Sequence, residues 1–209
     1  MTKLDAELRG EELTCRRGER LVFAGLSFAL EAGGALVVTG ANGSGKSSLL
    51  RLLATLLRPE SGRLLWSGSP VAADPAPYRA LIHYVGHLDA IKPALTPRET
   101  LGFWAGMRGR PARTDEALAA LGLERAATWP CRWLSAGQRR RLALARLVAS
   151  PAPIWLLDEP SAALDTEGES RLAAMIAAHR AAGGRVAVAT HQTLPIEGAQ
   201  SLALGDFAR

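Results

Sequence analysis

One stretch of the sequence has residues of the types and spacing that bind phosphate. It matches the pattern G-x-x-x-x-G-K-[ST] and consists of Gly40, Ala41, Asn42, Gly43, Ser44, Gly45, Lys46, Ser47 and Ser48. Its glycines allow the backbone to turn successive N–H groups inward around an anion. The ammonium of Lys46 can reach nucleotide phosphates, and the hydroxyl of Ser47 can ligate Mg²⁺. A chance match in a glycine-rich chain is the alternative.

The flanking residues are those that a phosphate-binding P-loop requires. Residues 35–39 form an apolar run that predicts a buried strand, and leucines recur at helical spacing from Leu49 to Leu57. The N-terminus of such a helix points its dipole at the phosphates. Lys46 is one of only three lysines among the 25 Lys and Arg residues. It stands where a compact ammonium fits better than a planar guanidinium. We therefore expect nucleotide binding with Mg²⁺.

Two acids follow a second apolar run. Ile154–Leu157 predicts a buried strand, and Asp158 and Glu159 come directly after it. A carboxylate at the end of such a strand suits a group held near Mg²⁺. Glu159 would then be placed to activate an attacking water. A strand that ends in two acids is common by itself, so this interpretation depends on the P-loop in the same chain.

A third motif, Leu134 to Gln138, opens a predicted helix. Ser135 and Gln138 have the spacing of a capping box for a helix over Ala136–Ala149. A plain helix start is the simpler interpretation. However, Gly137 in the first turn weakens a helix, and it makes better sense if another group approaches the backbone closely. The motif therefore predicts a second anion-binding helix N-terminus.

Composition excludes several classes of protein. The chain has 209 residues, of which 48% are hydrophobic and 22% charged, as in globular proteins. It has no run of 18 apolar residues that could span a membrane, and residues 1–7 lack the apolar core of a signal peptide. Cys15 and Cys131 are too few for a disulfide framework or a zinc site, so we expect reduced thiols. The net charge of +5 allows nucleic-acid binding, but we favour a solvated basic surface suited to anionic lipid.

The remaining patterns predict the elements that position these motifs. Further short strands are expected at Leu21–Phe23, Leu26–Leu30, Arg63–Trp66, Leu81–Val85 and Val186–Ala189. The runs after residue 150 lack alternation, which is typical of parallel strands covered on both faces. Residues 96–149 show only helical patterns, including a capping box at Thr96 and Glu99 and a helix near Asp115–Leu121. A last helix is expected at Ser170–Ala182.

The order of these motifs resembles that of the ATP-binding cassette (ABC) ATPases, in which a lone histidine, here His191, follows the last core strand. The resemblance implies a single α/β P-loop domain over 1–209 with an antiparallel β edge. Its P-loop core would cover 1–95 and 150–209, and its helical subdomain about 96–149. It also implies that ATP and Mg²⁺ are the cofactors, with Ser47 and Asp158 at the metal, Glu159 as catalytic base and His191 at the γ-phosphate.

The same resemblance implies a head-to-tail homodimer with two ATPs between the subunits. The ATP in the P-loop of one subunit would be contacted by Ser135, Gly137 and Gln138 of the other. The loop Ser161–Asp165 would cross the interface. Two positions depart from the family pattern. His87 stands where a glutamine normally senses Mg²⁺ and the membrane partner, and there is no aromatic residue near Arg17 to stack on adenine.

Cys15–Phe23 and Gly86–Thr96 narrow the resemblance to the ATP-binding subunits of haem exporters for cytochrome c maturation. This implies ATP hydrolysis that drives haem export or release of a haem-loaded chaperone, with membrane permeases and haem-handling maturation proteins as partners, and no nucleic acid. The chain would lie peripherally on the cytoplasmic face of the bacterial inner membrane. The alternatives are an ATPase for another small-substrate transporter and a non-transport ABC ATPase, which would usually carry two cassettes or long coiled coils.

Overall fold

The computed structural model describes residues 6–109, 111–191 and 195–207. The chain divides into two compact units, which we describe separately. The first unit consists of Met1–Tyr84, Pro153–Glu159 and Ile176–Arg209, and the second of Val85–Ala152 and Pro160–Met175. Residues 96–149, the predicted helical subdomain, all fall in the second unit.

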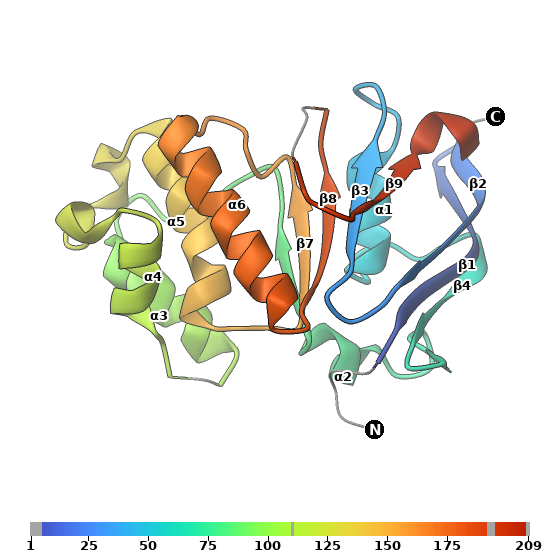
Figure 1. Cartoon of the computed structure of the whole chain (residues 1–209), viewed down its shortest axis with the longest axis horizontal. Coiled ribbons are helices and arrows are strands. Elements are labelled where there is room, and N and C mark those ends of the chain that lie inside the picture. The colour runs from blue at the N-terminus through green and yellow to red at the C-terminus, as the bar shows by residue number, and fades with distance from the viewer. Residues whose placement is uncertain (1–5, 110, 192–194, 208–209) are drawn as a thin grey trace. The chain divides into compact units, whose positions relative to one another are not determined.

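The first unit contains a five-stranded sheet in the order β6-β7-β8-β3-β9 (Figure 1). Its strands are β3 (Ala35–Thr39), β6 (Ile82–Val85), β7 (Ile154–Asp158), β8 (Arg185–Ala189) and β9 (Gln200–Ala203). The pairs β7–β8, β8–β3 and β3–β9 are parallel. Every residue of β7 and β8 is buried, which explains their continuous apolar sequences. The short edge strand β9 was not predicted, because its sequence carries little apolar pattern.

A second, antiparallel sheet has the order β2-β1-β4-β5 and forms the predicted β edge. Its strands are β1 (Leu8–Arg17), β2 (Arg20–Leu30), β4 (Ser61–Trp66) and β5 (Ser69–Pro70). The sequence indicated β2 and β4 but not β1. The reason is local, since the register of β1 against β2 shifts at several points and Glu12 adopts a φ of 49°. Such irregularities break the alternation by which a strand is recognised.

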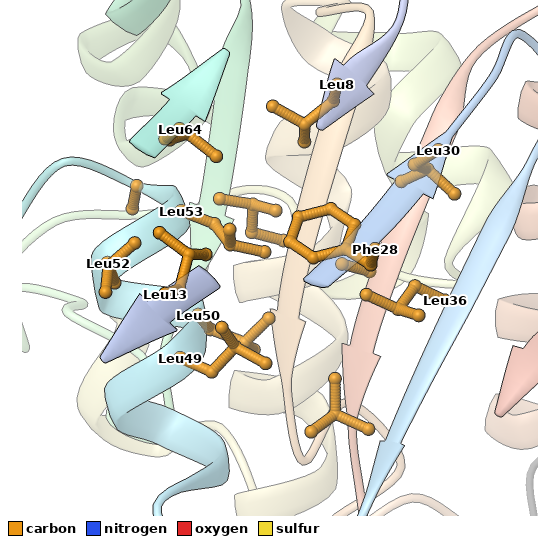
Figure 2. Close-up of a cluster of buried hydrophobic side chains, with 14 of the residues drawn as sticks. Leu8, Leu13, Phe28, Leu30, Leu36, Leu49, Leu50, Leu52, Leu53 and Leu64 are labelled. Atoms are coloured by element: carbon orange, nitrogen blue, oxygen red, sulfur yellow. The ribbon is translucent and has the colours of Figure 1, made fainter. Parts of the chain in front are cut away.

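Helix α1 (Lys46–Leu53) follows the P-loop and is anchored by leucines. Figure 2 shows its leucine side chains in one buried cluster with residues of both sheets, namely Leu8, Leu13, Phe28, Leu30, Leu36 and Leu64. Full burial of a leucine contributes roughly 1.5–3 kcal/mol each. The core therefore holds the helix start, and with it the P-loop, in place. The short helix α2 (Pro75–Arg79), capped by Asp74, was not predicted.

The second unit holds α3 (Pro97–Met107), α4 (Thr114–Ala120) and α5 (Ala136–Ala149), which pack on one another (Figure 1). The capping box at the start of α3 is present as predicted, because Thr96 N donates to Glu99 Oε2 at 2.8 Å and Glu99 N donates to Thr96 Oγ1 at 3.2 Å. Helix α5 has the bounds that the sequence predicted. The described residues between 96 and 149 contain no strand, again as predicted.

Helix α6 (Thr166–Ala181) begins four residues before the predicted start at Ser170. Asp165 caps it, since Gly168 N donates to Asp165 Oδ1 at 2.8 Å. A Cβ at Gly168 would lie 2.9 Å from that same oxygen, so the glycine is required by the cap and does not mark a loop. Among the described residues, no helix combines the length and apolar character needed to cross a membrane.

Candidate active site

The P-loop lies between β3 and α1 in the first unit, and its glycines are demanded by the local geometry. Gly40, Gly43 and Gly45 all have positive φ, at 148°, 78° and 106°. A Cβ at Gly45 would lie 2.2 Å from Val22 Cγ1, and one at Gly40 would lie 2.6 Å from Ser44 Oγ. No other residue fits at these two positions, so the tight loop that the sequence predicts is built into the packing.

Lys46 is held at the P-loop. Its side chain is buried, and Nζ donates to the carbonyl oxygens of Gly40 at 2.8 Å and Ala41 at 3.3 Å. On another side Nζ lies 3.9 Å from Glu159 Oε1. Ser44 Oγ is buried with no hydrogen-bond partner among the described residues. A desolvated ammonium and a hydroxyl with donor capacity to spare fit the oxygens of a phosphate.

Ser47 and Asp158 meet beside Lys46. Ser47 Oγ, on α1, donates to Asp158 Oδ1, at the end of β7, at 3.0 Å, and Asp158 is 1% exposed. Mg²⁺ is normally held by one or two protein oxygens together with phosphate oxygens and water, so this hydroxyl and carboxylate fit it. The described residues hold no group of three or more His, Cys, Asp or Glu arranged as a metal cage.

Glu159 and His191 form a pair next to this centre. The imidazole Nδ1 of His191 lies 2.9 Å from Glu159 Oε2, and Glu159 N donates to the carbonyl of Ala189 at 2.8 Å. Glu159 adopts a φ of 48°, a conformation that is strained for a residue with a Cβ. The two contacts explain how this backbone is maintained. The fold thus gathers Lys46, Ser47, Asp158, Glu159 and His191 from three separate parts of the chain, in line with the motif order.

In the second unit, Ser135 and Gln138 form the expected capping box at the start of α5. Gln138 N donates to Ser135 Oγ at 3.1 Å, and Ser135 N donates to Gln138 Oε1 at 2.9 Å. A Cβ at Gly137 would lie 2.8 Å from the carbonyl oxygen of Ala163. The close approach that Gly137 indicates therefore involves the chain's own backbone, and anion binding at this helix start stays a prediction. His87 is exposed in the turn after β6.

Comparison with known proteins decides the family. The sequence matches the family model described as ABC transporter over residues 12–162. The chain belongs to the ABC transporter ATP-binding family. This confirms the predicted ABC-type α/β fold and makes the chain an ATP-binding, ATP-hydrolysing subunit.

Relatives and solved structures agree with the family. The cytochrome c biogenesis ATP-binding export protein CcmA of Rhodospirillum rubrum is 60% identical over 200 residues, which cover 95% of this chain and 86% of the relative. The protein of the same name from Paramagnetospirillum magneticum is 52% identical over 209 residues, with 98% and 96% covered. A putative ABC transporter ATP-binding protein from Pyrococcus furiosus shares the fold, with a TM-score of 0.84, 21% identity and coverage of 97% and 100%. The cbiO1 structure from Clostridium perfringens, part of the ABC transporter complex cbiONQ, has a TM-score of 0.73 and 27% identity, with 88% and 78% covered.

Two residues at the site of this ABC ATPase were not predicted. Arg20 Nη2 donates to the carbonyl of Gly43 in the P-loop at 3.3 Å, close to where the family's adenine-stacking aromatic is missing. Tyr84, on β6, has side-chain hydrogen bonds to Asp158 and Arg51, and burial is the main cause that raises the pKa of its phenol. Both depend on which strands become neighbours, and no local sequence pattern marks them.

Proposed function

We propose that this chain is the ATP-hydrolysing subunit of an ABC transporter complex for cytochrome c biogenesis, in which hydrolysis drives haem export or the release of a haem-loaded chaperone. The observation that carries the proposal is the 60% identity, over 95% of the chain, to a cytochrome c biogenesis ATP-binding export protein. The gathered Lys46, Ser47, Asp158, Glu159 and His191 supply the groups that ATP hydrolysis needs.

Each of these residues has a distinct part in the reaction. The P-loop and Lys46 would hold the β and γ phosphates of ATP. Ser47 and Asp158 would hold Mg²⁺, which would neutralise charge on the phosphate oxygens. Glu159 accepts a proton from the water that attacks the γ-phosphorus, while the bond to the ADP oxygen breaks. His191, 2.9 Å from Oε2, orients this carboxylate and reaches toward the γ-phosphate. The products are ADP and inorganic phosphate.

The assembly that we propose is a head-to-tail homodimer docked on integral membrane permease subunits. Ser135, Gly137 and Gln138 of one subunit contact the ATP held by the P-loop of the other. His87 takes the place of the usual glutamine and reports the nucleotide state to the permease. The complex lies at the cytoplasmic face of the bacterial inner membrane, near haem-handling maturation proteins. The start of α5 supports this assembly only in a general way, because the N-terminal end of a helix favours an anion.

The test is a Lys46→Ala allele in the native host, with Lys92→Ala as the matched control. We expect Lys46→Ala to abolish ATPase activity without unfolding the protein, because the ammonium serves phosphate and not the core. All covalently haem-bound c-type cytochromes should then disappear together on haem-stained gels, while cytochromes with non-covalent haem persist. If c-type cytochromes remain while ATPase activity is lost, the chain serves another small-substrate transporter.

A further inference from the structure

Arg140 is an almost fully buried cation in α5, and the proposed mechanism gives it no part. Its side chain is 4% exposed, and the acceptors of its guanidinium include two backbone carbonyls and one carboxylate. Nε donates to the carbonyl of Pro160 at 3.2 Å, and Nη1 donates to the carbonyl of Gly86 at 2.9 Å and to Asp89 Oδ1 at 3.2 Å. A cation loses its hydration on burial, so such a group is retained only with several well-placed partners.

The two carbonyl acceptors belong to turns that carry functional side chains. Gly86 directly precedes His87, and Pro160 directly follows Glu159 in the chain. The side chain of Arg140 therefore donates hydrogen bonds to the backbone next to Glu159, the proposed catalytic base, and to the backbone next to His87, the proposed sensor of the permease.

A second contact ties the same segment to α5, one turn earlier. The carbonyl of Ala163 lies so close to Gly137 that a Cβ there would be 2.8 Å away. Ala163 and Glu159 both have positive φ, at 63° and 48°. Strained backbone of this kind persists only where the surroundings over-determine it. Residues 160–163 are thus hydrogen-bonded to α5 by Arg140, and they pack closely against its first turn at Gly137.

We propose that Arg140 is a positioning residue for ATP hydrolysis, which fixes the turns at Gly86 and Pro160 relative to the first turn of α5. This inference rests on the proposed function and adds to it the contacts that hold the residues directly beside the proposed base and the proposed sensor in sequence. The planar guanidinium of arginine can reach several acceptors in a fixed fork, whereas a lysine ammonium is a compact point charge on a flexible stem. Arg140→Lys keeps the buried charge and loses this fixed geometry.

The experiment compares Arg140→Lys with Arg141→Lys. Arg141 is the next residue on the same helix, and its Nη1 donates to the carbonyl of Leu121 at 3.3 Å. Both variants replace a guanidinium by an ammonium. Arg140→Lys removes the guanidinium from the turns at Gly86 and Pro160, whereas Arg141→Lys removes it from the carbonyl of Leu121. The melting temperature, kcat and KM for ATP are measured on the full-length protein in its membrane complex, below the onset of unfolding.

For Arg140→Lys we expect kcat to fall about tenfold with KM within about twofold, because a displaced base slows chemistry without weakening binding. Arg141→Lys should keep kcat within about twofold. A kcat equal to wild type, an equal loss in both variants, or a change in KM alone overturns the proposal. Arg140→Gln, which keeps a donor without the charge, repeats the test if the lysine variant does not fold.

Asp89→Asn separates the ion pair from the carbonyl contacts. The amide oxygen still accepts a hydrogen bond from Arg140, so kcat should stay within about twofold of wild type. A loss of kcat as large as that of Arg140→Lys would mean that the ion pair with Asp89, and not the hydrogen bonds to the two turns, accounts for the effect of Arg140. A wild-type complex without ATPase activity would refute the proposed function itself. An active wild type with an unaffected Arg140→Lys refutes only the positioning role.

Discussion

The hydroxyl of Ser47 donates to Oδ1 of Asp158 at 3.0 Å, although the two residues are 111 positions apart in the chain. Packing of α1 against β7 brings them together. The hydrogen bond joins the start of a helix to the end of a buried strand, so both oxygens are fixed before a ligand binds. Such pre-arranged oxygens suit a cation that tolerates little deviation from ideal geometry, as Mg²⁺ does.

Asp158→Asn should remove the contribution of Mg²⁺ to ATP binding. The amide oxygen can still accept from Ser47, but the negative charge beside the metal is lost. We expect the affinity for ATP with Mg²⁺ to fall about tenfold or more, by analogy with the loss of groups around metal sites, while the affinity without Mg²⁺ stays within about twofold. Titration with a fluorescent ATP analogue measures both, and Asp74→Asn at the cap of α2 is the control. Equal Mg²⁺ dependence in Asp158→Asn and wild type would remove Asp158 from the metal site.

Glu159→Gln should bind ATP and fail to hydrolyse it. Glutamine has the size of glutamate but cannot accept the proton of the attacking water, and loss of such a base costs about 10² to 10⁴ in rate. The variant should then accumulate as an ATP-bound dimer in gel filtration with ATP and Mg²⁺. Bound ATP stabilises the dimer, and the variant does not remove this ATP by hydrolysis. Glu19→Gln on the β1–β2 turn is the control. A monomeric variant with normal turnover would show that another group is the base.

The parts of the site that the sequence predicts correctly are those set by local spacing. The P-loop lies between a strand and a helix, as the spacing of its glycines, Lys46 and Ser47 predicts. Helix α5 starts where Ser135 and Gln138 cap it. A capping box is decided within four residues, so it can be recognised without knowing the fold.

The parts that were missed depend on distant neighbours. Tyr84 reaches Asp158 only because β6 and β7 are adjacent in the sheet, and Arg140 meets Gly86 and Pro160 only after α5 has packed. In the sequence Arg140 is one of three consecutive arginines, and nothing there separates the buried cation from its neighbours. Tertiary contacts of this kind become visible only in three dimensions.

The two cysteines should react slowly with alkylating reagents while the protein is folded. Cys15 and Cys131 are both buried, and desolvation raises the pKa of each thiol above its ordinary value. A higher pKa means less of the reactive thiolate at pH 8, and burial also limits access. Iodoacetamide labelling followed by mass spectrometry should show little modification in buffer and full modification in guanidinium chloride. Rapid labelling of either cysteine in the folded protein would contradict its burial.

The side chain of His179 should make the protein less stable as the pH falls below 6.5. Its ring stacks on Trp155 with centroids 3.7 Å apart and planes 5° from parallel, and a Cβ at Gly184 would lie 2.2 Å from it. Burial of the ring lowers the pKa of His179 to about 4. An unfolded histidine titrates near 6.5, so between these pH values the unfolded chain binds a proton that the folded protein does not. The stabilising effect of the neutral ring is complete above pH 6.5 and is lost as the pH falls to 4.

His179→Gln isolates this effect, because glutamine does not titrate. The free energy of unfolding, measured with urea from pH 7 to pH 4.5, should fall more in wild type than in the variant. A shift of this size corresponds to about 3 kcal/mol if the titration is complete, so a difference of roughly 2 kcal/mol is expected by pH 4.5. The variant is expected to be less stable at pH 7, since it loses the stacking on Trp155, and the comparison therefore uses the change with pH and not the absolute value. Parallel pH profiles would mean that His179 takes up its proton within the folded protein as readily as in the unfolded chain, and this would contradict the lowered pKa of its ring.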